Sequence, residues 1–144
     1  MRVTVIIDEG LDEEIIVHLK KESKIVDDIK HIASGNRADL VGYDENDIIR
    51  ISPEEASAFI VEDGRVYALL SGKRLRLKSR LYEIEDVLPE CFIRINQSCI
   101  VNISMIKKFT VSIGAALMVE LKCGYRDYVS RRQVKKVKER LRIK

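Results

Sequence analysis

The 144-residue sequence has no tryptophan, only two prolines and seven glycines, and 6% aromatic residues. So few prolines and glycines beside 46% hydrophobic residues argue against a disordered chain and favour a folded core. No apolar run approaches the roughly 18 residues that a membrane-spanning helix needs, and the N-terminal stretch lacks the apolar region of a signal peptide. We therefore expect a cytoplasmic protein that consists of one domain with a short N-terminal extension.

Cysteine and histidine are also scarce, which bears on metal binding and catalysis. Cys91, Cys99 and Cys123 form no C-x-x-C pair, so we expect reduced and buried thiols. His18 and His31 lie far from all three cysteines in the sequence, whereas a zinc site needs closely spaced ligands. No Ser/His/Asp or Cys/His arrangement has a recognisable local signature. The sequence predicts no metal ion, no other cofactor and no enzyme activity.

Charge is unevenly distributed along the chain, although the formal net charge is only +3. Residues 1–58 contain 14 acidic and 7 basic residues, a net charge of −7, whereas residues 59–144 contain 9 acidic and 19 basic residues, a net charge of +10. This division indicates that the second part of the chain faces a polyanion. A solvated basic tail explains the charge equally well.

The first 38 residues predict a small strand-strand-helix (β-β-α) extension. Residues 2–7 and 14–20 are rich in β-branched side chains and are predicted to be two strands around a turn at residues 8–12. Ser23 is positioned to cap a helix that ends at about residue 33. A unit of this size is too short to be stable alone, so we expect it to dock on another surface.

Residues 39–144 predict a β-dominated α+β domain. Short strands and turns follow one another every 6–12 residues, which is not the pattern of a doubly wound sheet. Asp63-Gly64 is a dipeptide favoured in type I′ hairpin turns, where both residues have positive φ. The predicted strands cover residues 40–43, 47–52, 57–62, 65–70, 73–77, 92–96, 98–101, 106–113, 116–122 and 125–129, and the predicted helices cover residues 80–88, 102–105 and the stretch that follows Ser130.

The predicted strand at residues 73–77 begins a basic segment. Side chains alternate between the two faces of a strand, so Arg74, Arg76, Lys78 and Arg80 share one face while the intervening leucines point inward. Cations about 6.5–7 Å apart match the spacing of phosphates along a nucleic-acid strand. Basic side chains also protect an exposed strand from unwanted pairing, so this alternative stays open.

The predicted C-terminal helix is the second basic segment. Ser130 is its expected N-cap, and Val134, Val137 and Leu141 follow at the spacing of one helix face. A solubilising helix face is the alternative to anion binding. The basic residues of this segment are Arg131, Arg132, Lys135, Lys136, Lys138, Arg140 and Arg142.

A third candidate is the polar run Asn96-Gln97-Ser98 at the end of an apolar strand. An amide side chain can pair with both hydrogen-bonding groups on the edge of adenine, and serine is suited to phosphate. An ordinary turn has the same composition.

Two segments carry a family resemblance. FIRINQSCIVNI, from Phe92 to Ile103, resembles the F-x-R-[IVC]-H-[RNQ]-S-x-[ILV]-V-N signature of the LytTR family of bacterial DNA-binding domains, and YVSRR at residues 128–132 resembles the P-V-S-R segment that opens the family's last helix. The resemblance covers roughly residues 40–144. The chain departs from the family in having Asn96 where histidine is usual and Gln97 where arginine is frequent.

The resemblance implies elongated antiparallel sheets in a β-β-β arrangement with short helices, and loops that enter the major groove of duplex DNA. It implies contacts from the hairpin at Asp63, Gly64 and Arg65, from the Asn96–Gln97 pair and from the start of the last helix. We expect base discrimination from Arg65, Asn96, Gln97 and Arg132. The full set of expected DNA-binding residues is Arg65, Arg76, Lys78, Asn96, Gln97, Ser98, Arg131, Arg132, Gln133 and Lys136.

The resemblance further implies a bacterial transcription regulator, related to response regulators, that binds repeated promoter half-sites as a dimer. Residues 1–38 are too short for a receiver domain, so the chain resembles stand-alone members. In such proteins the N-terminal piece is expected to mediate dimerisation or to receive a signal from a membrane-protein partner.

Two other functions fit a basic, β-rich chain. An RNA-binding module stacks bases on exposed aromatic side chains, but Phe59, Tyr67, Phe92 and Tyr128 occupy strand positions suited to a core. A protein-interaction domain with a basic face would bind an acidic partner without any preference for a DNA sequence. Competition between duplex DNA and single-stranded RNA separates the first alternative from DNA binding.

Overall fold

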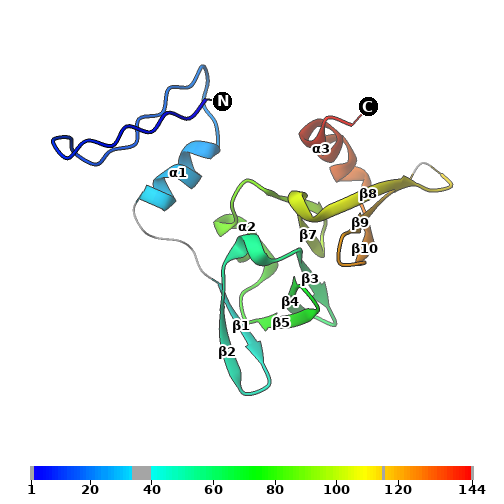
Figure 1. Cartoon of the computed structure of the whole chain (residues 1–144). Coiled ribbons are helices and arrows are strands. Elements are labelled where there is room, and N and C mark those ends of the chain that lie inside the picture. Colours follow the sequence, from blue (N-terminus) through cyan, green and yellow to red (C-terminus); the bar gives the residue numbers. More distant parts are fainter. Residues whose placement is uncertain (1, 34–39, 115, 144) are drawn as a thin grey trace.

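The computed structural model describes residues 2–33, 40–114 and 116–143 (Figure 1). These residues form two antiparallel sheets with short helices around them. The larger sheet has seven strands in the order β2-β1-β5-β4-β3-β7-β6, and the smaller has three in the order β10-β9-β8. The predicted β-dominated α+β fold is confirmed.

The elements lie close to their predicted positions. The strands of the large sheet are β1 (Leu40–Asp44), β2 (Asp47–Ile51), β3 (Ala58–Glu62), β4 (Arg65–Leu70), β5 (Lys73–Leu77), β6 (Phe92–Asn96) and β7 (Cys99–Asn102). Those of the small sheet are β8 (Ile106–Val111), β9 (Leu117–Leu121) and β10 (Arg126–Tyr128). The α-helices are α1 (Ile25–Ala33), α2 (Leu81–Val87) and α3 (Arg131–Leu141). Two short 3-10 helices are η1 (Pro53–Glu55) and η2 (Ile103–Met105).

The tight hairpin between β3 and β4 has the backbone that its two turn residues favour. Asp63 has φ 52° and Gly64 has φ 71°, both in the left-handed region. These values match a type I′ turn, whose twist agrees with that of the flanking strands. The turn sets the register in which Glu62 lies opposite Arg65 and Ile60 lies opposite Tyr67.

The large sheet has an apolar core on each of its faces. Because successive side chains of a strand point to opposite faces, Phe59 of β3 enters one core while Ala58 and Ile60 enter the other. The first core is closed by α2 through buried Leu81 and Ile84. The second is closed by the small sheet and α3; its members there are Leu117, Val119, Leu121 and Val137.

The N-terminal extension differs from its prediction. The turn near Asp8 forms, since the Leu11 amide donates to the Asp8 carbonyl at 3.2 Å. Among the described residues before α1, however, none is assigned to a strand, so the strands predicted at residues 2–7 and 14–20 are wrong for this structure. A two-stranded hairpin is marginal without a surface to cover it, and the large side chains of this segment are exposed.

The helix of the extension does form where predicted. The Ser23 hydroxyl accepts a hydrogen bond from the Ile25 amide at 3.4 Å, and the Ser23 carbonyl accepts one from Val26 at 3.2 Å. Asp28 of α1 accepts a hydrogen bond from the Glu90 amide at 3.1 Å, which ties the helix to the larger unit. The predicted boundary between residues 38 and 39 lies outside the described residues.

The three cysteines differ in exposure. All are free thiols, with Cys99 buried, Cys91 half-buried and Cys123 exposed. Burial raises the pKa of the Cys99 thiol well above its ordinary value, and the nearby Asp127 carboxylate raises it further. The prediction of burial is therefore right for Cys99 and wrong for Cys123, because Cys123 lies in the turn between β9 and β10.

Candidate nucleic-acid interface

Two turns meet at one end of the large sheet. The β3–β4 turn at residues 63–64 and the β6–β7 turn at residues 97–98 are far apart in the sequence, but β3 pairs directly with β7, with Ile60 opposite Cys99. The Val61 amide donates to the Ser98 carbonyl at 2.8 Å, which extends this pairing to the base of both turns. Arg65 and Gln97 are exposed at this end.

The start of α3 is attached to the same end of the sheet. The Ser130 amide donates to the Ile95 carbonyl at 2.8 Å, and the Asn96 Nδ2 donates to the Tyr128 carbonyl at 2.8 Å. Arg131 and Arg132 follow at once and are exposed, while Gln133 is half-buried. The structure thus brings together the three loops to which the sequence assigned DNA contacts.

Asn96 is engaged on both sides of its amide. Besides the bond to Tyr128, its Oδ1 accepts a hydrogen bond from the Ser98 amide at 2.7 Å. The side chain therefore shapes the turn and joins it to the strand before α3. Gln97, at the tip of that turn, is exposed, which leaves it the better placed of the two amides for contact with a base edge.

Arg94 stabilises the same turn, a role that the sequence alone does not indicate. Its Nε donates to the Asn96 carbonyl at 3.0 Å and its Nη2 donates to the Gln97 carbonyl at 2.7 Å. Its Nη1 forms an ion pair with Glu85 of α2 at 2.6 Å. The signal available in the sequence was an arginine on an otherwise apolar strand, two residues before the polar turn.

The basic segment is arranged as its alternation predicts as far as Lys78, whereas Arg80 lies outside the strand as the N-cap residue of α2. Arg74, Arg76 and Lys78 are exposed while Leu75 and Leu77 are buried. Because Val66 pairs with Leu77, Lys78 emerges at the same end of the sheet as Arg65. The backbone of Arg74 lies toward the other end of β5, opposite Leu69, but its guanidinium reaches back over Tyr67 to form an ion pair with Glu62 and so is less available to an anion.

Two tyrosines lie among these cations. The Lys78 ammonium is 4.4 Å from the ring centroid of Tyr43, and the Arg74 guanidinium is 4.9 Å from that of Tyr67. Arg76 pairs with Tyr43 on one side and with Tyr67 on the other. Cation–π contact of this kind holds a basic side chain in place while its charge stays exposed.

The aromatic residues are only partly in the core. Phe59 and Phe92 are buried, as expected. Tyr67 is half-buried, and Tyr128 is 52% exposed, so the core assignment of Tyr128 is wrong. Along β10, Arg126 and Tyr128 are exposed and Asp127 between them is half-buried, so Tyr128 lies on the solvent face of its strand.

Helix α3 presents its basic residues outward. Val137 is fully buried and Val134 and Leu141 are half-buried, as the predicted helix face requires. Lys136 is exposed, whereas Arg140 hydrogen bonds to the Glu90 carbonyl and so fixes the far end of the helix. Ser130 is the N-cap residue, but its side chain makes no capping hydrogen bond; its carbonyl accepts from Gln133 at 2.9 Å instead.

The small sheet that supports α3 contains a buried carboxylate. Glu120 of β9 is 7% exposed and forms ion pairs with Arg126 at 3.0 Å and Lys108 at 3.4 Å. Burial raises the pKa of Glu120, but the hydrogen bonds from Arg126 and Lys108 outweigh this effect, so the pKa lies below its ordinary value. The triad links β8, β9 and β10.

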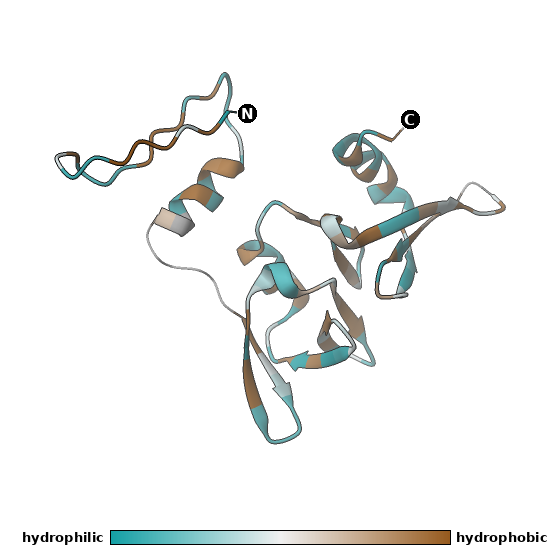
Figure 2. Ribbon diagram, viewed as in Figure 1, coloured by the Kyte–Doolittle hydropathy of each residue, from teal (hydrophilic) through white to brown (hydrophobic). Residues whose placement is uncertain are grey.

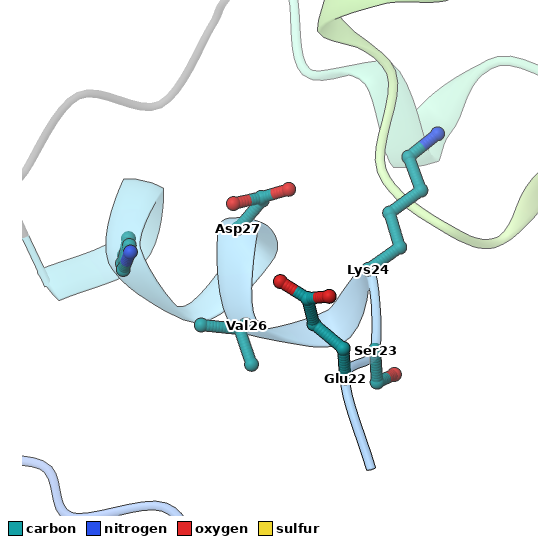
Figure 3. A pocket seen from close by; sticks show the side chains of 6 residues that line it. Glu22, Ser23, Lys24, Val26 and Asp27 are labelled. Carbon is teal, nitrogen blue, oxygen red and sulfur yellow. The ribbon is translucent and has the colours of Figure 1, made fainter.

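A hollow beside the first turn of α1 shares no residue with the three loops (Figure 3). Its lining mixes both charges and has one apolar side chain; the residues are Glu22, Ser23, Lys24, Val26, Asp27 and Lys30. No group of three or more potential metal ligands occurs within residues 2–33, 40–114 and 116–143. Among the helices formed by those residues, none is long and apolar enough to cross a membrane.

Comparison with known proteins gives matches over the same part of the chain. A family model described as the LytTr DNA-binding domain matches residues 46–142. Uncharacterized HTH-type transcriptional regulators of Staphylococcus aureus strains NCTC 8325 / PS 47 and COL are each 40% identical over 104 residues, or 72% of this chain and 71% of theirs. The solved LytTr DNA-binding domain of a Bacillus cereus protein, described as a methyl-accepting/DNA response regulator, superposes with a TM-score of 0.67 at 22% identity, covering 72% of this chain and 95% of that one.

Proposed function

Because this chain belongs to the LytTr DNA-binding domain family, we propose that it binds duplex promoter DNA as a dimer on repeated half-sites. At the coarser level, the chain is a DNA-binding transcriptional regulator of a non-enzymatic family. Promoter DNA is in the cytoplasm of a bacterium, and we place the protein there. A membrane-protein signalling partner stays a prediction.

The proposal depends on one observation above all, the attachment of α3 to the β6–β7 turn. The bonds from Asn96 to Tyr128 and from Ser130 to Ile95 join the β6–β7 turn, which carries the exposed amide of Gln97, to the start of α3, which carries the exposed guanidinium of Arg132. Amide and guanidinium side chains are those that pair with adenine and guanine edges in the major groove. Two such groups held rigidly together suit the reading of a short sequence.

We divide the predicted DNA-binding residues into two groups by their placement. Gln97 in the β6–β7 turn, Arg65 at the start of β4 and Arg132 in the first turn of α3 are exposed and are proposed to contact bases, with Asn96 acting through Gln97. Exposed cations beside these loops are proposed to contact phosphates, where they release counterions. The second group also includes two uncharged polar residues, Ser98 and Gln133. Its basic members are Arg76, Lys78, Arg131 and Lys136.

A titration tests the function. Fluorescence anisotropy would follow binding of the full chain to a labelled duplex from its own upstream region at about 50 and about 200 mM salt. We expect tighter binding to this duplex than to a scrambled one, and affinity that falls steeply with salt. Equal affinity for both duplexes would favour a protein-interaction domain, and preferential competition by single-stranded RNA would favour an RNA-binding module; either result would overturn the proposal.

A matched pair of lysine variants tests the phosphate contacts. Lys78→Ala removes a cation beside the loops and should weaken binding to all duplexes. It should also reduce by about one the magnitude of the slope of log K against log salt concentration. Lys122→Ala is the control, because Lys122 is exposed at the opposite end of β9 from the start of α3. Similar salt slopes for the two variants would contradict the assignment of Lys78.

A further inference from the structure

The N-terminal extension carries an apolar surface that the DNA-binding function does not use. Nine large hydrophobic side chains within residues 2–20 are at least 37% exposed, and Ile7 reaches 93%. Figure 2 shows the hydrophobic residues as brown stretches along this extended segment. So much exposed apolar surface in one segment marks a site of interaction. The nine residues are Val3, Val5, Ile6, Ile7, Leu11, Ile15, Ile16, Val17 and Leu19.

The second half of this segment is complementary to itself. Residues 13–21 read EEIIVHLKK, with two acids at the start, two bases at the end and Val17 at the centre. If two copies align antiparallel about Val17, Glu14 of each copy lies opposite Lys20 of the other, and Glu13 lies opposite Lys21. Opposite charges facing each other across antiparallel strands are stabilising, and like charges are destabilising.

The same alignment also places apolar residues of the two copies next to one another on one face. In a strand, Ile15, Val17 and Leu19 share one face, so two paired copies place six apolar side chains side by side. Ile15 of one copy then lies opposite Leu19 of the other, and the two Val17 residues meet at the two-fold axis. Such an interface uses one patch on both partners, as a closed dimer requires.

We propose that residues 14–20 of two copies pair as antiparallel strands about Val17 and so form the dimer. The strand that the sequence predicts at these residues would then form on association. Ile25 and Ile29 of α1, both half-buried, follow closely in the chain and supply apolar surface to cover the paired strands. The inference rests on the proposed dimer for its connection to DNA, but self-association itself needs no DNA.

Charge complementarity favours a second copy over a membrane surface as the occupant. A segment that binds an anionic membrane needs a basic polar side, whereas this one begins with Asp12, Glu13 and Glu14. The same segment ends with Lys20 and Lys21. In an antiparallel second copy, these two bases lie opposite Glu14 and Glu13.

Sedimentation velocity of the full chain without DNA tests the pairing through a charge swap. The wild type should dimerise, and Glu14→Lys or Lys20→Glu alone should weaken the dimer by roughly tenfold, because each places like charges opposite one another. The double variant E14K/K20E should recover wild-type association. Mixing the two single variants should yield a heterodimer, since their charges are then complementary.

Other outcomes overturn the inference or keep it separate from the proposed function. A monomeric wild type at high protein concentration, or a double variant no better than the single ones, would overturn it. Val17→Asp should abolish the dimer, whereas Thr4→Asp, outside the paired strand, should not; equal effects would also overturn it. Because these readouts contain no DNA, a dimer that fails to bind any duplex would contradict the proposed function alone.

Discussion

At the scale of single residues, the side chains that shape the interface are distinct from those that reach out of it. Asn96 uses its amide oxygen for the Ser98 amide and its amide nitrogen for the Tyr128 carbonyl. Gln97, the next residue, is exposed at the tip of the turn. We therefore propose different roles for the two adjacent amides, one in holding the loop and one in contacting DNA.

Replacing the two amides separately should reveal this difference. Asn96→Ala removes two hydrogen bonds and should lower the free energy of unfolding by about 1–2 kcal/mol, with weaker binding to every duplex. Gln97→Ala touches nothing buried and should change stability by less than about 0.5 kcal/mol while relaxing the preference at one base pair. Urea denaturation and anisotropy titrations measure both quantities. If Asn96→Ala leaves stability and affinity unchanged, the positioning role is wrong.

Arg94 of β6 is the second positioning residue. Its guanidinium contacts the Asn96 carbonyl, the Gln97 carbonyl and the Glu85 carboxylate at once. Lysine has a single ammonium and cannot donate to the Asn96 and Gln97 carbonyls while also pairing with Glu85. Arg94→Lys should therefore weaken DNA binding several-fold, although Arg94 is proposed to touch no DNA. The side chains of Arg94 and Glu85 are 24% and 41% exposed, so solvent screens the ion pair between them.

A double-mutant cycle separates the ion pair from the carbonyl contacts. We expect Glu85→Gln to reduce stability by less than about 1 kcal/mol and to leave most of the affinity. In the Arg94→Lys background the same change should have a smaller effect. Purely additive effects in urea denaturation would show that Glu85 does not act through Arg94.

At the scale of secondary-structure elements, the sequence was informative wherever a strand had a buried face. Apolar patterning between turn residues located the strands from residue 40 to residue 129 to within one or two residues, because most of these strands have at least one face against a core. Residues 14–20 have the same β-branched composition but are assigned to no strand, because composition does not say whether a partner strand is present. The core assignment of Tyr128 is wrong for a related reason, since an aromatic side chain in a strand does not by itself show which face of the strand meets the core.

The small sheet should show an acid-sensitive stability through Glu120. Its pKa is lowered in the folded protein by Arg126 and Lys108. A lowered folded pKa contributes stability above the unfolded value of about 4.3, and this stability is lost as the pH falls through the folded value. Glu120→Gln should remove this part of the pH dependence. Urea midpoints of both proteins from about pH 6 to about pH 3 should therefore converge on acidification, and parallel curves would contradict the assignment.

At the scale of the whole molecule, the order of the strands brings exposed basic residues from distant parts of the sequence to one end of the large sheet. The pairing of β3 with β7 and the bond from Ser130 to Ile95 place residues near positions 64, 97 and 131 at one end of the large sheet. The family resemblance predicts that these three segments contact DNA, and the structure brings them together. The contacts that fix them, such as Arg94 with Glu85 and Asn96 with Tyr128, depend on pairings between distant segments and could not be inferred from local patterns.

The proposed dimer makes a further prediction about the spacing of half-sites on DNA. Two copies on one face of the duplex need half-site centres about one helical turn, 10–10.5 bp, or a multiple of it apart. Inserting about 5 bp between the half-sites should rotate one copy away and abolish cooperative binding, and inserting about 10 bp should restore part of it. Mobility shifts that are indifferent to the insertion would show that each copy binds alone.

The central claim is that the β6–β7 turn and the start of α3 form one surface that reads DNA. The most direct test is the affinity of the wild type, Gln97→Ala and Arg132→Ala for a set of duplexes with every single base-pair substitution in one half-site. We predict that each variant loses about 1–3 kcal/mol of discrimination at a different base pair, with both base pairs inside the same half-site. Discrimination equal to that of the wild type in both variants would contradict the claim.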